Sequence, residues 1–385
     1  MNVPITNASF NVTQNCNLGC PYCFAHEKTR KRMSFEIGKK CVDFLLKNAL
    51  DANINHLPGK RRAVDISFWG GEPLMEWGMI QKLVEYSENC ELSKDVAVSF
   101  SGTTNGTLLT EDKLDFLADH NLFFMVSIDG TAETHNLNRK FRDGRGSHAT
   151  IMKNMDSVLK RWPWYSVRLS ISADRADHFF EDMKYLIDSG FKTLMFSPVY
   201  ESAWTDEKWD IFEEQYRALA DLNIERGNFK LEHLEQYAEP YPNRFPCGAG
   251  RFYVGIDIDG SIYPCHRFNK FDDSRPWQEK EVCLGHVDCG ITNLAFRQQF
   301  IDGRKCGDCN SDCDRTPCKG GCPATNYDLG GTLNHVSLIC KYSGIMQRVS
   351  KYWLEKIKNP PALALLKELE TEMVDRLLTL EKKWQ

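Results

Sequence analysis

The chain has 385 residues, enough for two or three domains, and 42% of them are hydrophobic, which suits a protein with a substantial core. Its 48 basic and 53 acidic side chains are interspersed and give a formal net charge of -5, so neither nucleic acid nor an acidic membrane is expected as a partner. No stretch approaches the roughly 18 consecutive apolar residues of a membrane span.

The N-terminus and the cysteines indicate a reducing compartment. Residues 1–4 lack the charged and apolar regions of a signal peptide, so a cytoplasmic location is predicted. Fifteen cysteines then disfavour a disulfide framework, because the cytosol keeps thiols reduced. Three of them lie within residues 16–23, and eight lie at or beyond residue 247 in metal-like spacings. The other four are expected to be structural: Cys41, Cys90, Cys283 and Cys289.

From residue 5 to about residue 226, short β-rich runs alternate with longer segments of helical periodicity. This alternation predicts an α/β fold with βα units around a parallel sheet. Strands are predicted at 7–12, 63–69, 96–101, 122–128, 166–172 and 192–198. Helices are predicted at 35–50, 75–89, 111–119, 147–161, 177–189 and 206–226. Six such units fit an incomplete (β/α)6 barrel, in which chemistry takes place at the C-terminal ends of the strands.

The first two strands lead into segments that suit a metal centre. Cys16, Cys20 and Cys23 follow the first strand in a C-x3-C-x2-C spacing, and three thiolates leave one position of a four-ligand site open. Taken alone, the last two cysteines also suit a redox pair or half of a zinc knuckle. The second strand ends in Gly70-Gly71-Glu72-Pro73, where glycines allow close backbone approach and Glu72 can accept from an ammonium group. That segment is also compatible with an ordinary turn.

These two motifs, in this order and about fifty residues apart, resemble those of radical SAM enzymes. In that family three cysteines hold a four-iron four-sulfur cluster, and the remaining iron chelates S-adenosylmethionine. The G-G-E-P segment receives the methionyl amino group. An electron donated into the sulfonium breaks the 5′ C–S bond, and the 5′-deoxyadenosyl radical abstracts hydrogen from the substrate. The resemblance implies a partial TIM-like barrel, S-adenosylmethionine as cofactor, and an electron donor such as flavodoxin or ferredoxin.

Polar segments also end the third and fourth strands. They read S-G-T-T-N-G-T at 101–107 and F-F-M-V-S-I-D-G at 123–130. The second resembles a segment of peptide-modifying radical SAM enzymes that is followed by a histidine and an arginine, here His135 and Arg139. Read singly, Asn-Gly and Asp-Gly are turn signals, and His135 is compatible with a helix cap.

The same resemblance implies roles for side chains around the cofactor. Arg139 would be the charge partner of the methionine carboxylate, a task suited to a guanidinium. Tyr22, inside the cysteine loop, would lie beside the adenine. Residues near the ribose or the carboxylate would be Thr104, Asn105 and Ser127.

A second cysteine field follows a linker marked by prolines at 240, 242 and 246. It contains a predicted hairpin at 252–262, turning at Asp259-Gly260. The field resembles the SPASM extension of radical SAM enzymes, which binds two auxiliary iron-sulfur clusters. The predicted domains are therefore a barrel at 1–230, this extension at 231–343 and C-terminal helices at 344–385. The helices are predicted at 344–358 and 362–383; packing on the barrel is favoured over binding a partner chain.

The resemblance also assigns cysteines to the two auxiliary clusters. One set would be Cys306, Cys309, Cys318 and Cys340, and the other Cys247, Cys265 and Cys322. Eight residues, 310–317, separate two of these cysteines where the family pattern has five, and Cys313 lies among them. Cys313 could complete the second set, replace Cys318 or be a spare thiol. Four thiolates suit zinc as well as iron-sulfur clusters, so only the first cysteine loop and G-G-E-P favour iron.

Enzymes with a SPASM extension most often modify peptides or proteins, which implies such a substrate here. Anaerobic sulfatase-maturating enzymes form formylglycine and typically carry Asp after the second extension cysteine, where this chain has His266. A histidine can also act as a base near neutral pH. The segments Y-P-C-H-R-F and C-G-A-G look more like maturases that form thioether or carbon-carbon crosslinks in ribosomal peptides, so crosslinking is favoured.

Many such maturases carry a leader-binding domain. This chain starts almost at its first strand, so that domain is expected in a separate protein. A radical SAM enzyme for a small molecule and a non-enzymatic zinc-binding scaffold are the remaining alternatives.

Overall fold

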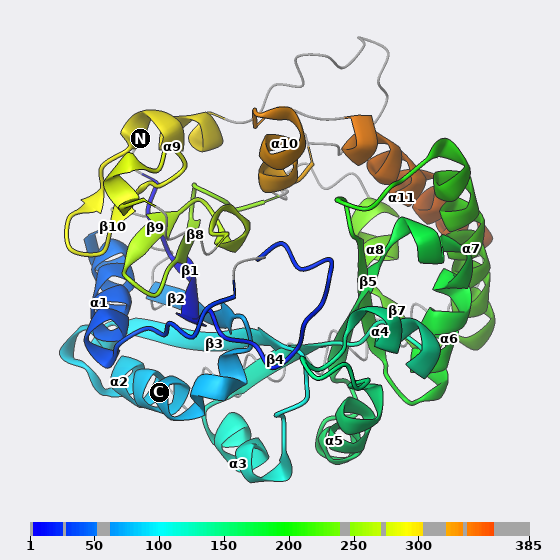
Figure 1. Cartoon of the computed structure of the whole chain (residues 1–385), viewed down its shortest axis with the longest axis horizontal. Helices are drawn as coiled ribbons and strands as arrows, with labels where there is room; N and C mark the ends of the chain where they lie inside the picture. Colours follow the sequence, from blue (N-terminus) through cyan, green and yellow to red (C-terminus); the bar gives the residue numbers. More distant parts are fainter. Residues whose placement is uncertain are drawn as a thin grey trace.

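The computed structural model describes residues 3–25, 28–51, 62–238, 247–270, 275–302, 321–333 and 337–357. In these ranges an 11-stranded sheet has the order β11-β10-β9-β8-β1-β2-β3-β4-β5-β6-β7. Helices lie around its outside, and the loop that follows β1 lies over its centre (Figure 1). The order has two ends, β11 and β7, so the described sheet is an open barrel. The predicted partial barrel is confirmed.

The strands of the barrel follow one another in parallel. They are β1 (Asn7–Thr13), β2 (Arg62–Gly70), β3 (Val96–Thr104), β4 (Leu122–Ser127), β5 (Ser166–Ile171), β6 (Thr193–Pro198) and the short β7 (Lys230–Leu231). The six predicted strands are confirmed, and β3 extends to Thr104, beyond its predicted end. Because all these strands are parallel, their C-terminal ends meet on one side of the barrel.

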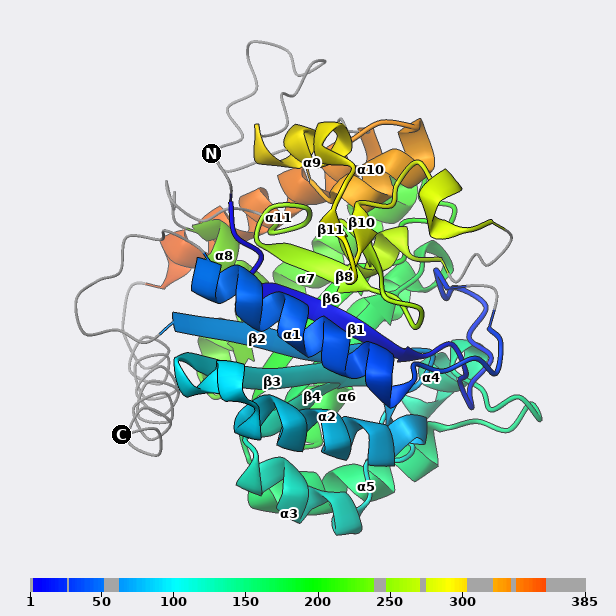
Figure 2. The same ribbon diagram turned by 90° about the vertical axis from the view of Figure 1, so that its left-hand side faces the viewer.

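Amphipathic helices cover the outer face of the sheet, as Figure 2 shows for α1 and α2. The six predicted helices are confirmed as α1 (Phe35–Asp51), α2 (Trp77–Asn89), α3 (Glu111–Asp119), α5 (His148–Arg161), α6 (Phe179–Asp188) and α7 (Asp206–Arg226). Their ends obey local rules. The Thr205 hydroxyl caps α7 by accepting from the Lys208 N–H, and the helix ends at Gly227, whose φ of 59° suits glycine.

Short helices escaped the sequence analysis because they span too few turns to show a period. They are α4 (Ala132–Asn138), α8 (Glu232–Ala238), α9 (Leu294–Ile301) and α10 (Pro323–Gly330).

The cysteine-rich segment continues the barrel sheet. Its predicted hairpin is confirmed as β8 (Tyr253–Ile256) and β9 (Ser261–Tyr263), which pair antiparallel. β8 also pairs parallel with β1, from Asn7↔Tyr253 to Phe10↔Ile256. β10 (Gly285–His286) and β11 (Gly290–Ile291) complete that end. β1 therefore has neighbours from both parts of the chain, whereas the boundaries at residues 230 and 343 stay predictions.

Helix α11 (Ser337–Lys356) packs against α7 and α8. The first predicted C-terminal helix is thus confirmed, although it begins at Ser337 rather than at residue 344, and the second, 362–383, lies outside the described residues. Trp353 anchors α11 by donating from Nε1 to Asn223 Oδ1 over 2.8 Å.

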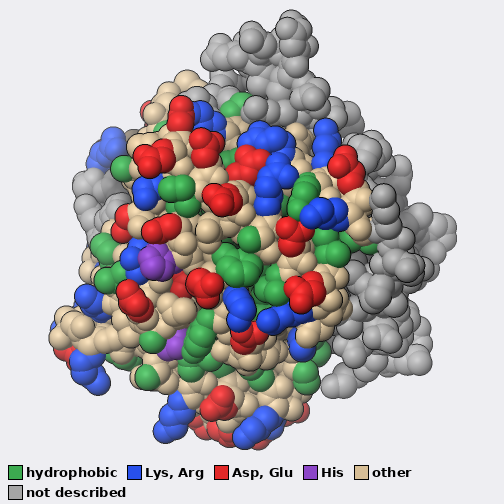
Figure 3. Space-filling view, turned by 90° about the vertical axis from the view of Figure 1, so that its right-hand side faces the viewer, with side chains coloured by type: hydrophobic (Ala, Val, Ile, Leu, Met, Phe, Trp, Pro, Cys, Tyr) green, Lys and Arg blue, Asp and Glu red, His purple; other side chains and the backbone are tan. Residues whose placement is uncertain are grey.

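Basic and acidic side chains are interspersed on the face shown in Figure 3. Lys356 and Asp221 form an exposed ion pair over 2.9 Å. In the described part of the chain, no helix is long and apolar enough to cross a membrane.

Replacing Gly102 tests how tightly the barrel strands pack. A Cβ at Gly102 would lie 2.3 Å from Phe124 Cε1 and 2.9 Å from the Phe68 carbonyl oxygen. We expect Gly102→Ala to lower the free energy of unfolding by about 1–3 kcal/mol, measured by chemical denaturation, because neither neighbour can retreat freely. Gly78→Ala in α2 is the control, since no atom lies within 4 Å of its Cβ position and alanine favours helix. Equal effects of the two substitutions would contradict this account.

Candidate active site

Two glycines dock the end of β2 onto the start of the cysteine loop. The Gly71 N–H donates to the Thr13 carbonyl over 2.8 Å, and the Glu72 N–H donates to the Asn15 carbonyl over 2.8 Å. A Cβ on Gly70 would lie 2.3 Å from the Thr13 oxygen, and one on Gly71 would lie 2.2 Å from the Asn15 oxygen. Only glycine allows this approach. It brings the predicted cluster loop and the carboxylate after β2 to the same place.

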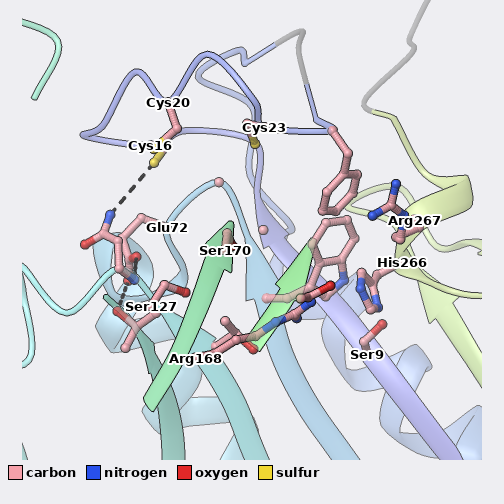
Figure 4. Close-up of a pocket in the computed structure, with 18 of the residues that line it drawn as sticks. Ser9, Cys16, Cys20, Cys23, Glu72, Ser127, Arg168, Ser170, His266 and Arg267 are labelled. Atoms are coloured by element: carbon pink, nitrogen blue, oxygen red, sulfur yellow. Dashed lines mark hydrogen bonds between the residues drawn. The ribbon is translucent and has the colours of Figure 1, made fainter. Parts of the chain in front are cut away.

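A cavity of about 440 Å³ lies at the C-terminal ends of the strands (Figure 4). It brings together nearly all the residues predicted around the cofactor. These are Cys16, Cys20, Tyr22, Cys23, Gly70, Gly71, Glu72, Thr104, Asn105, Ser127, Arg139 and His266. Pro73 is buried behind Glu72 as the first residue of the 3-10 helix Pro73–Glu76. Their individual roles stay predictions.

Glu72 is a buried carboxylate with three hydrogen-bond donors. It accepts from Thr104 Oγ1 over 2.7 Å, from the Asn105 N–H over 2.7 Å and from the Leu74 N–H over 3.0 Å. Burial raises the pKa of Glu72 to about 7, although these donors favour the ionised form. A carboxylate held in this way beside a cavity suits an ammonium ligand. The contacts of Thr104 and Asn105 show that both orient Glu72.

A second buried carboxylate, that of Asp129, follows β4 and contacts β5. Asp129 accepts from Arg139 Nε over 2.8 Å and from the Ser170 N–H over 2.9 Å, and the Tyr22 hydroxyl also donates to it. Burial would raise the pKa of Asp129, but the Arg139 guanidinium lowers it below its usual value. Arg139 also lies over the Tyr22 ring, 5.5 Å from its centroid. Its charge therefore has a partner within the protein before any ligand binds.

His135 holds the segment that carries Arg139. Its Nδ1 accepts from the Asp129 N–H over 3.2 Å, so its Nε2 carries the proton and donates to Ser147 Oγ over 2.9 Å. Ser147 in turn donates to the Arg139 carbonyl over 2.6 Å. Burial lowers the pKa of His135 to about 3, which keeps the ring neutral. The histidine thus orients Arg139 rather than simply capping a helix.

The cysteine loop suits iron-bound thiolates. Cys16 Sγ accepts from the Leu18 N–H over 3.4 Å and lies 3.9 Å from Asn105 Nδ2, and N–H groups aimed at sulfur tune such clusters. Burial raises the pKa of the Cys16 thiol to about 11. Across the described ranges no three His, Cys, Asp or Glu side chains form a preassembled metal site. The three thiols do line the same cavity, and this donor set fits a cluster that leaves one iron open.

His266 lies on the side of the cavity formed by the cysteine-rich segment. Its ring centroid is 5.3 Å from that of Trp69 and 5.9 Å from that of Phe24. A 2.6 Å hydrogen bond joins its Nδ1 to the Tyr253 hydroxyl, which also donates to Ser9 over 2.9 Å. Burial, with the nearby positive charge of Arg267, lowers the pKa of His266 to about 3. The ring is therefore neutral, and its role as a base stays a prediction.

Part of the predicted auxiliary ligand set can be located. Burial raises the pKa of the Cys265 thiol, and the neighbouring thiols of Cys322 and Cys247 raise it further, so these three groups lie near one another. Cys340 lies on α11. The remaining predicted ligands fall outside the described residues: Cys306, Cys309, Cys313 and Cys318. The two auxiliary clusters therefore stay predictions.

Sequence reasoning missed several residues of the cavity and its surroundings. Asp129 was interpreted only as part of an Asp-Gly turn, although a strand end in a barrel is a place for such a side chain. Arg168 occupies a polar position of the alternating strand β5, between Ser166 and Ser170, and a charge inside a parallel strand is a detectable signal. Trp69 and Tyr253 carried no distinctive signal, because aromatic residues in strands usually belong to the core.

Comparison with known proteins shows which family the residues around this cavity resemble. Residues 10–169 match the model of the radical SAM superfamily. The chain therefore contains a radical SAM domain. The superfamily implies S-adenosylmethionine and a four-iron four-sulfur cluster as cofactors, in agreement with the three thiols and the buried glutamate of the cavity.

Two relatives show how far the similarity extends. An uncharacterized protein of Methanocaldococcus jannaschii is 30% identical over 190 residues, 48% of this chain, and the match spans only 59% of that protein's length. The cysteine-type anaerobic sulfatase-maturating enzyme of Clostridium perfringens is 28% identical over 335 residues, which cover 80% of this chain and 86% of that enzyme.

Two solved structures share the fold. Native anSMEcpe, with bound AdoMet and the Cp18Cys peptide, gives a TM-score of 0.72 at 22% identity, covering 91% of this chain and 98% of that one. SuiB of Streptococcus suis, bound to the precursor peptide SuiA, gives a TM-score of 0.58 at 15% identity, covering 88% of this chain and 76% of that one. At these identities the likeness concerns the fold.

The protein should depend on Asp129 for its stability. Asp129→Asn removes the negative partner of buried Arg139, and we expect a loss of about 3–5 kcal/mol of unfolding free energy in chemical denaturation. Asp115→Asn is the matched control, because Asp115 pairs with Arg161 over 2.7 Å but is 80% exposed. Breaking that exposed pair should cost at most about 1 kcal/mol. A loss for Asp129→Asn no larger than that of the control would contradict the role given to the pair.

Proposed function

We propose that this radical SAM enzyme modifies a peptide or protein. The observation that carries the proposal is the cavity, where three thiols, Glu72 and Arg139 line the same space as His266 and Trp69. The first group suits a cofactor, and the second leaves an aromatic wall for a substrate. The proposal is supported by the relatives and structural neighbours, which include sulfatase-maturating enzymes and peptide-bound structures.

Some residues of the cavity would bind the cofactor, and others would contact the substrate. When bound, the cluster and S-adenosylmethionine supply a 5′-deoxyadenosyl radical that abstracts hydrogen from the substrate. Cys16, Cys20 and Cys23 would hold the cluster, and Glu72 would accept from the methionyl amino group. Arg139 would use N–H donors beyond those that contact Asp129 and Ser170 for the methionine carboxylate, since a guanidinium has five.

The cysteine-rich segment would serve the same reaction. We propose two auxiliary iron-sulfur clusters on its cysteines, an electron donor such as flavodoxin or ferredoxin, and a cytoplasmic location. A separate leader-binding protein would present a ribosomal precursor peptide. The segment follows a barrel that ends near residue 230, and it extends to about residue 343.

Crosslinking of a ribosomal peptide is the reaction we favour. The position after Cys265 holds neutral His266, which packs against Trp69 and Phe24 and is hydrogen-bonded to Tyr253, rather than a carboxylate. The sulfatase-maturating resemblance leads one to expect an aspartate there. Formylglycine formation is the second candidate, favoured by the 28% identity to the Clostridium perfringens enzyme over 86% of its length.

Product analysis distinguishes the two reactions. The anaerobically reconstituted enzyme would be incubated with reductant, S-adenosylmethionine and either a precursor peptide encoded beside its gene or sulfatase peptides that contain a cysteine or a serine target. We expect 5′-deoxyadenosine together with a precursor peptide that has lost two hydrogen atoms and gained a crosslink in tandem mass spectra. A hydrazine-reactive aldehyde on a sulfatase peptide, with no change in the precursor, would instead establish formylglycine formation.

Replacing the first three cysteines is the control for this assay. The variant Cys16→Ala, Cys20→Ala, Cys23→Ala should form no 5′-deoxyadenosine but keep the iron and sulfide of the auxiliary clusters, because those use other cysteines. Iron and sulfide analysis of the anaerobically purified protein measures this directly. Complete loss of iron in the variant, or zinc without iron in the wild type, would contradict the proposed clusters.

A further inference from the structure

Arg168 is a cation that β5 directs into the barrel. Residues 167, 169 and 171 of the strand are buried, whereas Arg168 and Ser170 alternate with them and line the cavity. Figure 4 shows the Arg168 side chain extending from β5 into the cavity, toward the side of His266 and Arg267. None of the proposed cofactor contacts involves this charge, and no ion pair among the described residues involves it.

Arg168 has no carboxylate partner among the described residues. The groups that act on its charge most strongly are the phenols Tyr200 and Tyr342 and the cations Arg267 and Arg139. Every carboxylate that lines the cavity contacts another group. Asp65 accepts from Ser99, Glu72 accepts from Thr104, and Glu201 pairs with Arg267.

An unpaired, partly buried guanidinium is costly for folding stability. A guanidinium keeps its charge at neutral pH, and partial burial without a partner sacrifices hydration without compensation. The two neighbouring arginines are both paired, Arg139 with Asp129 and Arg267 with Glu201. Arg168 is therefore the lining arginine whose charge no described side chain balances, which makes it a candidate for ligand binding.

Its depth separates Arg168 from the proposed cofactor site. Ser170 Oγ accepts from Arg139 Nη2 over 3.3 Å, so this strand position belongs to the end of the cavity assigned to methionine. Arg168 lies two residues earlier on β5, about 6–7 Å deeper in the barrel at the usual rise of a strand. Its charge acts on His266, on the wall assigned to the substrate.

We infer that Arg168 binds a carboxylate of the substrate peptide, supplied either by an Asp or Glu side chain or by the peptide C-terminus. The inference rests on the proposed function, because it takes the ligand to be a peptide. A guanidinium can form two parallel hydrogen bonds with a carboxylate, and the low polarity of the surroundings strengthens them. Arg168 would thereby fix the depth to which the substrate enters the barrel.

Three synthetic peptides test the inference on the holoenzyme with S-adenosylmethionine bound. They are acetyl-Gly-Ser-Glu-Gly-amide, its Gln analogue, and the Gln analogue with a free C-terminal carboxylate. Isothermal titration calorimetry would measure their Kd values for wild-type enzyme and for Arg168→Gln. We expect one of the two acidic peptides to bind wild type about tenfold tighter than the neutral amide, and which one identifies the source of the carboxylate. In Arg168→Gln the preference should fall below about twofold, and Arg168→Lys should restore only part of it.

Arg161→Gln is the matched control, because Arg161 lies outside the cavity and pairs with Asp115 over 2.7 Å. It should keep the preference for the acidic peptide. Arg168→Gln should also keep the wild-type Kd for S-adenosylmethionine. Wild-type enzyme that fails to bind acidic peptides at millimolar concentration, or binds them no better than the amide, overturns the inference. A preference that survives Arg168→Gln, or a loss confined to S-adenosylmethionine affinity, also overturns it.

Two further readouts keep the result interpretable. Arg168→Met removes an unpaired charge, so its Tm without peptide should equal or exceed that of wild type, and the acidic peptide should raise the Tm of wild type alone. If acidic peptides bind through Arg168 but no peptide supports 5′-deoxyadenosine formation, the proposed function fails while the binding site stands. If peptide-dependent 5′-deoxyadenosine forms and its KM is indifferent to Arg168→Gln, the function stands and the inference fails.

Discussion

The close backbone contact between Gly70-Gly71 and residues 13–15 is the constraint on which the active site depends. Two hydrogen bonds join these segments, and neither glycine has room for a Cβ. Because β1 and β2 are adjacent and parallel, their C-terminal ends are already close, and the glycines remove the remaining separation. The contact places the cysteine loop and Glu72 around one cavity. The proposed contacts of the cluster and of the methionyl amino group follow from that placement.

Charge pairing then divides the cavity into two regions. Asp129 neutralises Arg139 near the predicted cofactor side, and Glu201 neutralises Arg267 near the cysteine-rich segment. Glu72 is held by neutral donors, so its burial is compensated by hydrogen bonds rather than by a cation. Against this background the unbalanced charge of Arg168 stands out. A barrel interior can hold an unpaired cation where a ligand of opposite charge compensates the cost of its burial.

Strand β1 joins the barrel to the cysteine-rich segment. It pairs with β2 of the barrel and with β8 of the cysteine-rich segment, so the two parts form one sheet in the described chain. A hydrogen bond between side chains, from the Tyr253 hydroxyl to Ser9, also joins β8 to β1. His266 and Arg267 follow β9 and thereby become part of the same cavity wall. Backbone pairing thus holds the proposed substrate and cofactor regions in place relative to each other.

The barrel elements and the two cofactor motifs were predictable from the amino-acid sequence, because these depend on local patterns. Helix and strand periodicity repeats within each segment, and the cysteine and glycine spacings are contiguous. Short elements such as α4 were missed because they contain too few turns to show a period. Three features became visible only in the folded chain: Asp129 neutralises Arg139, β8 joins β1, and Arg168 faces the cavity without a carboxylate partner in the described chain. These features depend on contacts between residues far apart in the sequence, and local sequence patterns do not identify such contacts.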